Sequence, residues 1–279
     1  MNKHRGDRAT LLVFIIAILM LIPNLAHAQA ARFVASNGND GNACTRGAPC
    51  RTLQRGVDSA PPAAVVQVLD SGVYGQSLAI SKSVTVLASG VAATVGRVAI
   101  QGDAGRVKLH GLHITGRAAT GASAATVAVT VGAIVDIENC DLDGAQANIF
   151  GLRVDTDGAK ISLVGSTVRN HSLFHGVLVT TSSSDSHVTI ENSRILNNAE
   201  GVRNVGSGSE ISIERTIIAG NGVGVHTQFG GLVRISNSVV TDNGVGLNHA
   251  GGTLQSRLNN MVSGNTTDTS GTITTLGGT

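Results

Sequence analysis

Apolar residues recur along the chain in a fixed pattern from residue 84 onward. Eight segments, which start 21–28 residues apart, carry apolar side chains at their first, third and eighth positions. Of these 24 positions, 23 are apolar and 18 are Val or Ile, the residue types that favour β-strands. The first and third positions predict a strand that points alternate side chains inward. The segments start at Val84, Val107, Val135, Ile161, Val188, Ile211, Val233 and Leu254.

Turn-forming and small residues separate the predicted strands. The fifth position is Gly or Asn in five of the eight segments, and both types tolerate the left-handed backbone conformation. The sixth position holds Ser166, Ser193, Thr216 or Ser238, and Cys140 falls in the same column. We expect these hydroxyls to hydrogen-bond the turn backbone, and the thiol to be buried and inert.

A second corner follows at Asn198, Asn221 and Asn243, and a Gly followed by Val or Leu stands three residues further on. This pattern predicts a third short strand in each segment. No proline follows Pro62, as expected of continuous sheet, in which every backbone N–H is needed. Three strands per segment, stacked on the next segment about 4.8 Å away, describe a solenoid.

These repeats, with asparagines at their corners, resemble the right-handed parallel β-helix of the pectin-lyase-like superfamily. The segments Phe33–Asp40, Cys50–Gln54 and Val66–Val68 are similar to the opening of exported bacterial β-helix proteins. The resemblance covers residues 32–270 and implies an all-β solenoid of about nine coils with a short N-terminal capping helix. The superfamily contains lyases, glycosidases, adhesins and inert members, so the fold does not decide the function.

Residues 1–28 have the features of a secretory signal peptide. A basic start precedes the apolar run Leu11–Ile22, and small residues allow cleavage near Ala28 or Ala30. Twelve apolar residues span about 18 Å as a helix, well short of the roughly 30 Å hydrocarbon core of a membrane. We therefore expect an exported protein, periplasmic or extracellular, with no membrane span in the mature chain.

Residues 29–63 are expected to cap the solenoid, and residues 64–279 to form the β-helix domain. Cys44 and Cys50 flank a short turn, which predicts a disulfide in an oxidising compartment. Arg51–Ala60 has the pattern of a capping helix that ends at the two prolines that follow. The C-terminal end has no recognisable cap, so self-association through that end is a candidate interaction.

Charge and composition exclude one class of partner. Lys and Arg number 20 against 18 Asp and Glu, and aromatic residues make up 2% of the chain. Removal of residues 1–28 takes away three basic residues and one acidic residue, which leaves 17 of each sign. A neutral chain lacks the dense basic face that nucleic-acid binding requires, and it has few aromatic platforms on which bases could stack.

Candidate chemistry lies on the outward column of the third predicted strand. That column contains Leu178 between arginines, and His171 stands nearby. Arginine, histidine and aspartate side chains on one face could bind an acidic sugar and act as acid and base. The alternative is an ordinary polar surface, because the spacing does not fix their mutual geometry. The candidate residues are Arg153, Asp155, Asp157, His175, Arg203 and His226.

Comparison with the enzymes of the superfamily favours a non-catalytic protein. Asp155–Gly158 is similar to the first acidic motif of β-helix galacturonan hydrolases, but their Gly-Asp-Asp, Gly-His-Gly and Arg-Ile-Lys motifs are absent. Lyases of this fold use Ca²⁺ held by several carboxylates, so a Ca²⁺ cofactor is expected only under a lyase hypothesis. Glu191 and Glu214 are a candidate cation site on adjacent coils, unless they pair with Arg215.

The sequence therefore favours an exported, non-catalytic β-helix that serves as a rigid surface or periplasmic module and contacts glycan or envelope components. The alternative is a polysaccharide-degrading enzyme, either a lyase or a glycoside hydrolase. No cofactor is expected for the first function.

Overall fold

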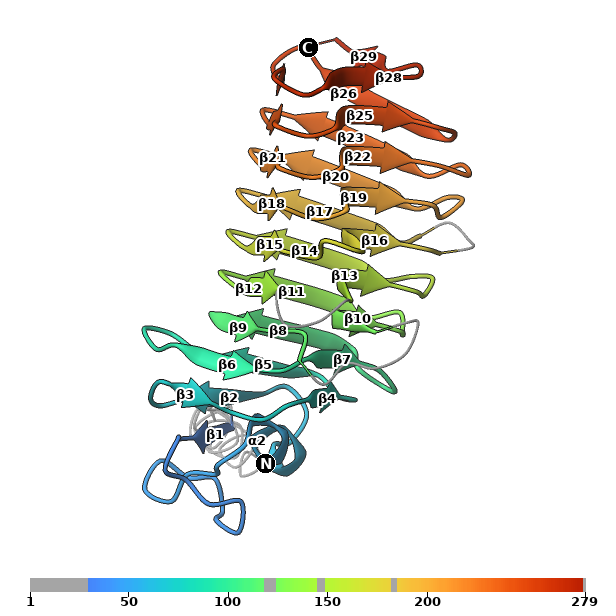
Figure 1. The fold of residues 1–279 in the computed structure, drawn as a ribbon. Helices are drawn as coiled ribbons and strands as arrows, with labels where there is room; N and C mark the ends of the chain where they lie inside the picture. Colours follow the sequence, from blue (N-terminus) through green and yellow to red (C-terminus); the bar gives the residue numbers. More distant parts are fainter. Residues whose placement is uncertain (1–29, 118–123, 145–148, 182–184, 278–279) are drawn as a thin grey trace, which may run out of the picture. The chain divides into compact units, whose positions relative to one another are not determined.

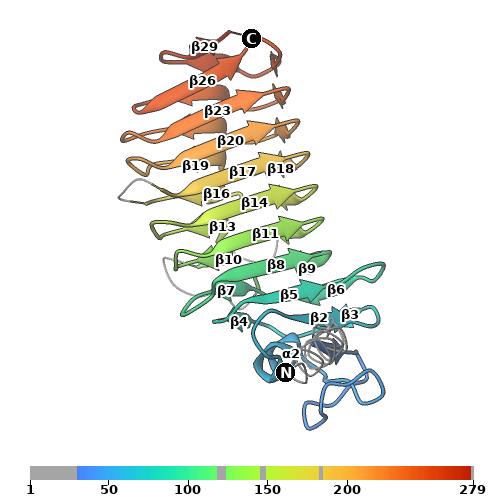
Figure 2. The same cartoon turned by 180° about the vertical axis from the view of Figure 1, so that it is seen from behind.

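A computed structural model describes residues 30–117, 124–144, 149–181 and 185–277. Within the unit Ala31–Thr279, the strands form three parallel sheets of 11, 9 and 9 strands. Successive coils each add one strand to each sheet (Figure 1), and Figure 2 shows the same stack from behind. The all-β parallel solenoid predicted from the repeats is confirmed.

The first sheet contains β1 (Ala31–Val34), β2 (Ala64–Val68), β5 (Val84–Leu87), β8 (Arg106–His110), β11 (Ile134–Glu138), β14 (Lys160–Val164), β17 (His187–Glu191), β20 (Glu210–Glu214), β23 (Leu232–Ser236), β26 (Thr253–Arg257) and β29 (Thr274–Leu276). The second sheet contains β3 (Gly72–Val73), β6 (Ala93–Val95), β9 (Leu112–Ile114), β12 (Asp141–Asp143), β15 (Thr167–Arg169), β18 (Arg194–Leu196), β21 (Ile217–Ala219), β24 (Val239–Thr241) and β27 (Met261–Val262). The third sheet contains β4 (Leu78–Ile80), β7 (Val98–Ile100), β10 (Ala125–Val129), β13 (Phe150–Val154), β16 (His175–Val179), β19 (Glu200–Asn204), β22 (Val223–Thr227), β25 (Val245–His249) and β28 (Thr267–Ser270).

The core is made of stacked Val, Ile and Leu side chains. Ile190, Ile213 and Ile235 are register partners on adjacent coils, and each is at most 1% exposed. Burial of such a side chain stabilises the fold by roughly 1.5–3 kcal/mol. In-register stacking of identical apolar residues therefore holds these coils to one another.

The turn between the first and second sheets uses the left-handed conformation that its sequence predicts. The φ angles at this position are 51° at Asn139, 49° at Asn192 and 47° at Arg215. The hydroxyl column beside it is buried, and each hydroxyl accepts from the backbone N–H of the neighbouring coil, for example Ser193 N to Thr216 Oγ1 at 3.4 Å. Cys140 lies in this column, and burial raises the pKa of its thiol to about 11.

The turn between the second and third sheets contains the asparagine ladder. Asn221 Oδ1 accepts from Asn198 Nδ2, and Asn243 Oδ1 accepts from Asn221 Nδ2, at 3.0 and 2.9 Å. His171 occupies the next position of the ladder, where its backbone N–H donates to Asn198 Oδ1 at 3.1 Å. It is 1% exposed. The expectation that His171 lies beside the outward candidate residues is therefore wrong.

Two positions of the sequence repeat differ from the structure. The repeat places Val91 in the inward column of the second sheet, but Val95 pairs with Ile114 there because the preceding turn is longer. In the last segment, Val262 rather than Met261 pairs with Val240. Insertions within a turn shift the register without changing the apolar character of the segment, so the pattern alone cannot detect them.

The N-terminal part agrees with the predicted helix and disulfide. Helix α2 spans Leu53–Ser59 and is capped by Thr52, whose side chain accepts from the backbone N–H of Arg55. Cys44 and Cys50 form the disulfide. Strand β1 pairs with β2, so the first sheet extends into residues 31–34, ahead of the predicted boundary at residue 64.

The predicted signal peptide, residues 1–28, lies outside the described residues. None of the helices in the described ranges is long and apolar enough to span a bilayer. At the other end of the described chain, β27, β28 and β29 are the last strands of their sheets. Self-association through this end stays a prediction.

Candidate functional site

The outward face of the third sheet gathers the candidate residues in two columns. Arg153, Leu178, Arg203 and His226 are register partners from β13 to β22. His175 begins β16 in the neighbouring column. We call this surface the third-sheet face. The structure places four of the six residues expected from sequence on this face, since Arg153, His175, Arg203 and His226 all belong to it.

Glu200 lies at the centre of the polar groups on this face. Its Oε2 atom is 3.2 Å from Nδ1 of His226 and 3.6 Å from Nδ1 of His175, while Oε1 accepts from Nη1 of Arg203 at 3.2 Å. Burial raises the pKa of Glu200, but the hydrogen bond from His226 and the neighbouring positive charges outweigh it, so the pKa is lowered. Glu200 therefore stays ionised in this cluster.

Sequence reasoning missed Glu200, although a signal for it exists. Glu200 is the register partner of His175, one coil further along. Alignment of the third strands on their Gly-Val pairs would have placed the two residues in one column. The sequence expectation followed the column of Arg153 from coil to coil and included His175 as a nearby residue, but it did not follow the column of His175 to Glu200.

Two of the expected acidic residues have different positions. Asp155 contacts Arg153 Nε at 2.6 Å and accepts a hydrogen bond from Thr180 Oγ1 at 2.5 Å. Asp157 is exposed in the turn that follows β13. Among the residues that the structure describes, no hydrogen bond or ion pair joins Asp155 or Asp157 to Glu200 or the histidines, so the six expected residues do not form one cluster.

Aromatic side chains border the third-sheet face. The Phe150 ring packs 4.7 Å from the Phe174 ring and 5.5 Å from the imidazole of His175, and the Arg153 guanidinium lies 4.8 Å above it. Phe229 follows β22 and is 70% exposed, with a left-handed φ of 55°. Three of the five phenylalanines in the chain therefore lie in or beside third-sheet strands.

Electrostatics decide the protonation state of two groups on this face. A general acid needs a carboxyl group that remains protonated near neutral pH, and Glu200 has the opposite shift. Burial also lowers the pKa of His175, which keeps its imidazole neutral. The cluster offers hydrogen-bond donors and acceptors in a partly desolvated setting, and such groups orient a polar ligand.

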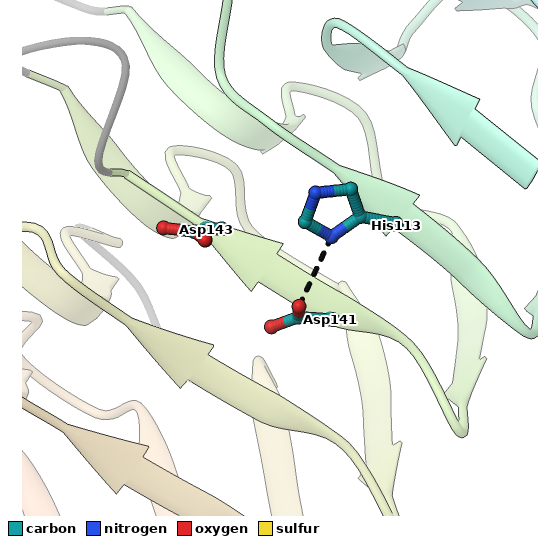
Figure 3. Close-up of side chains that lie close together, drawn as sticks. All are labelled: His113, Asp141 and Asp143. Atoms are coloured by element: carbon teal, nitrogen blue, oxygen red, sulfur yellow. Dashed lines mark hydrogen bonds and ion pairs between the residues drawn. The ribbon is translucent and has the colours of Figure 1, made fainter. Parts of the chain in front are cut away.

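A second polar cluster, absent from the sequence expectations, lies on the outward face of the second sheet (Figure 3). His113 Nδ1 lies 3.0 Å from Asp141 Oδ2, and Arg169 contacts both oxygens of Asp141 at 2.9 and 2.8 Å. A groove of about 530 Å³ adjoins this cluster. His113 and Asp143 line it together with Thr94, Thr115, Arg117 and Gln76.

The second cluster also has the donor types of a metal site. Ligand atoms of His113, Asp141 and Asp143 lie within 4.8 Å of one another. However, Arg169 already supplies a positive charge to both carboxylates, and its Nη2 atom is 2.9 Å from Asp143 Oδ2. Burial raises the pKa of Asp141, but the hydrogen bonds from Arg169 and His113 outweigh it and lower the pKa. Both carboxylates thus already pair with Arg169, and Asp141 also pairs with His113.

Comparison with known proteins assigns the chain to a family. The family model described as a right handed beta helix region matches residues 97–267. The chain belongs to this right-handed β-helix family. Among solved structures, the crystal structure of pectate lyase Pel9A superposes with a TM-score of 0.53 at 16% sequence identity, over 90% of this chain and 78% of the other. At that identity the likeness concerns the fold alone. No curated protein sequence matches the chain.

In this β-helix protein, a positively charged side chain of the protein itself lies between Glu191 and Glu214. The two residues are register partners on β17 and β20, as the repeat predicts. The guanidinium of Arg215 lies between them and forms an ion pair with each carboxylate. Arg215 takes the role that a bound cation would otherwise have, which is the alternative that the sequence left open.

Proposed function

We propose that this β-helix protein is an exported, non-catalytic glycan-binding module, and that the third-sheet face is its binding surface. The observation that carries the proposal is the half-buried Phe174 ring, which packs on the buried Phe150 ring beside the cluster of His175, Glu200 and Arg203. Sugar rings combine apolar C–H faces with hydroxyl edges, so a surface of this mixed character suits them.

The rigid backbone supports the same proposal. Each side chain of the face stands on a strand whose neighbours on both sides are paired in register. Groups on such a scaffold lose little conformational entropy when a ligand binds. An extended surface that repeats from coil to coil also matches the repeating units of a polysaccharide.

A second candidate function is polysaccharide cleavage, and one observation favours it. Glu200 orients His226 through Nδ1, and a carboxylate that orients an imidazole is a recurrent part of acid–base sites. The structural neighbour is a pectate lyase by its title, but that activity belongs to the neighbour. The lowered pKa of Glu200 and the ion pair of Asp155 favour the non-catalytic function.

The proposal is tested by binding of the full chain to a panel of immobilised polysaccharides. We expect retention on at least one glycan, and about three- to tenfold weaker binding for Phe174→Ala, because one aromatic contact contributes about 0.5–1.5 kcal/mol. Thr189→Val, on the outward side of β17 in the first sheet, is the matched control and should bind like the wild type.

The same panel separates the two functions. Release of reducing ends or of unsaturated uronates, with or without added Ca²⁺, would establish the enzyme and overturn the non-catalytic proposal. Absence of binding to every glycan of the panel would overturn the glycan-binding proposal for those ligands.

A further inference from the structure

Opposite charges on and beside the third-sheet face occur in pairs. Arg203 lies 3.2 Å from Glu200, and Arg153 lies 2.6 Å from Asp155. Asp157, in the turn after β13, adds a further negative charge at the edge of the face. The formal charge of these five residues, two arginines and three acids, is therefore −1. No charged residue and no histidine occurs in residues 118–123, 145–148 or 182–184.

Unpartnered polar atoms gather around Glu200. Among the residues that the structure describes, His175 Nδ1, Arg203 Nε and His226 Nε2 are buried without a hydrogen-bond partner. His226 as a whole is only 9% exposed. A buried polar group without a partner costs about 1–3 kcal/mol, so three such atoms at one place indicate a site that a ligand completes.

The chemistry of two of these atoms is complementary. Arg203 Nε can only donate. His226 Nδ1 faces a carboxylate oxygen of Glu200, which only accepts, so a ring with one proton carries it on Nδ1 and leaves Nε2 as an acceptor. Arg203 and His226 are register partners on the adjacent strands β19 and β22. A hydroxyl group accepts and donates at the same time, whereas a carboxylate only accepts.

We propose that the third-sheet face selects an electrically neutral glycan, one of whose hydroxyl groups accepts from Arg203 Nε and donates to His226 Nε2. This inference rests on the proposed glycan-binding function and specifies its ligand class. A polymer that carries a carboxylate on every residue brings negative charge to a face where both arginines are already paired. The ionised carboxylates of such a polymer also have no hydrogen to donate to His226 Nε2.

Matched polymer pairs test the inference directly on the full chain. In each of three pairs, the two polymers share one backbone and differ in charge. The first pair is methyl-esterified and de-esterified homogalacturonan, the second is hydroxyethyl and carboxymethyl cellulose, and the third is dextran and carboxymethyl dextran. Affinity is measured for each pair at low and high salt. We expect the neutral member to bind about tenfold more tightly or better, which corresponds to about 1.4 kcal/mol, with little dependence on salt.

Other outcomes of this comparison separate the two proposals. Tighter binding of an anionic member at low salt, lost at high salt, overturns the neutral selectivity and leaves the glycan-binding function standing. Binding to none of the six polymers nor to any other glycan of the panel overturns the proposed function and this inference with it.

A charge substitution provides a second test. Glu200→Gln keeps the size of the side chain but leaves the charge of Arg203 unpaired, so we expect the preference to shift by about tenfold toward the anionic member of each pair. Glu191→Gln changes the net charge equally on the first sheet and should leave the preference unchanged. An unchanged preference in folded Glu200→Gln, verified by circular dichroism, overturns the inference.

The hydrogen-bonding part has its own variants. His226→Gln retains a side-chain acceptor, whereas His226→Leu does not. We expect His226→Gln to retain most of the affinity for a neutral glycan and His226→Leu to lose about tenfold, since the hydroxyl then lacks one partner. Equal affinities of the two folded variants would overturn the proposed contact with Nε2, whatever the result for Glu200.

Discussion

The side-chain oxygen of Asn221 accepts two hydrogen bonds from Asn198, one from its backbone N–H at 2.9 Å and one from Nδ2 at 3.0 Å. Asn221 in turn donates from Nδ2 to Asn243 and to the backbone carbonyl of Ile195. Each rung of the ladder thereby satisfies the buried polar groups of the rung before it.

The first prediction concerns this ladder. Asn221→Ala removes the side-chain acceptor of the buried Asn198 backbone N–H and one donor to the carbonyl of Ile195, so we expect a loss of about 2–4 kcal/mol in the free energy of unfolding. Chemical denaturation measures this loss. Thr189→Val, at an exposed position of β17, should change stability by less than about 0.5 kcal/mol. A change in Asn221→Ala as small as in this control would contradict the ladder's role.

The second prediction concerns His171 and acid. Burial lowers the pKa of this imidazole, and its contacts with the carbonyls of Ile149 and Leu142 offset that only in part. A histidine with a lowered pKa in the folded state contributes its full stability above the unfolded pKa of about 6.5 and loses it as pH falls below that value. Wild-type stability should therefore decline between neutral pH and pH 5.

The comparison variant for this prediction is His171→Asn, which continues the ladder with a group that does not titrate. Denaturation midpoints of the two proteins across pH 5–8 give the difference. The wild type should lose more stability than His171→Asn toward acid. Parallel curves would mean that the pKa of His171 is the same in the folded and unfolded states, which would contradict the prediction.

The third prediction concerns the second cluster. The hydrogen bond to Asp141 raises the pKa of His113, and burial offsets it only in part. A histidine whose pKa is raised in the folded state contributes its full stability below the unfolded pKa of about 6.5. This contribution is lost as the pH rises through the folded pKa. NMR titration should give His113 a midpoint above 6.5. Asp141→Asn should lower that midpoint, and Asp136→Asn, on the first sheet, should not.

The fourth prediction concerns Arg215. Arg215→Asn keeps a residue that tolerates the left-handed φ of 47° but removes the cation between Glu191 and Glu214. Two carboxylates then face each other on adjacent coils, so we expect a lower melting temperature at low salt. Added Ca²⁺ should raise the melting temperature of the variant and leave the wild type unchanged. An equal response of both proteins would show that the guanidinium does not replace a cation.

The sequence predicted the parts of the fold that depend on local pattern. Alternating Val and Ile predicted the strands of the core, and Asn192 and Asn237 marked turns that the structure confirms in the left-handed conformation. The same periodicity placed Arg203 and His226 in one column, because register in a solenoid follows from the repeat itself. Where turn lengths vary, as before Val95, the periodicity failed.

The candidate sites depended much more on the tertiary structure. Glu200 and His226 are 26 residues apart, and His113 and Asp141 are 28 residues apart. No motif links either pair. They meet because successive coils stack about 4.8 Å apart, which turns a separation of one repeat into a contact. Side-chain direction at the ends of a strand then decides which contact forms, and His171 turned inward where the sequence expected it near the surface.

The amino-acid sequence by itself thus determined the architecture of this protein. An apolar repeat with asparagine corners buries its side chains and hydrogen-bonds its backbone groups when successive coils stack on one another. Only the tertiary structure decided which polar residues of different coils meet, and therefore where charges cancel and where donors stay unpartnered. The physical reason is that burial acts on every rung alike, whereas hydrogen bonds and ion pairs depend on distances between individual atoms of neighbouring coils.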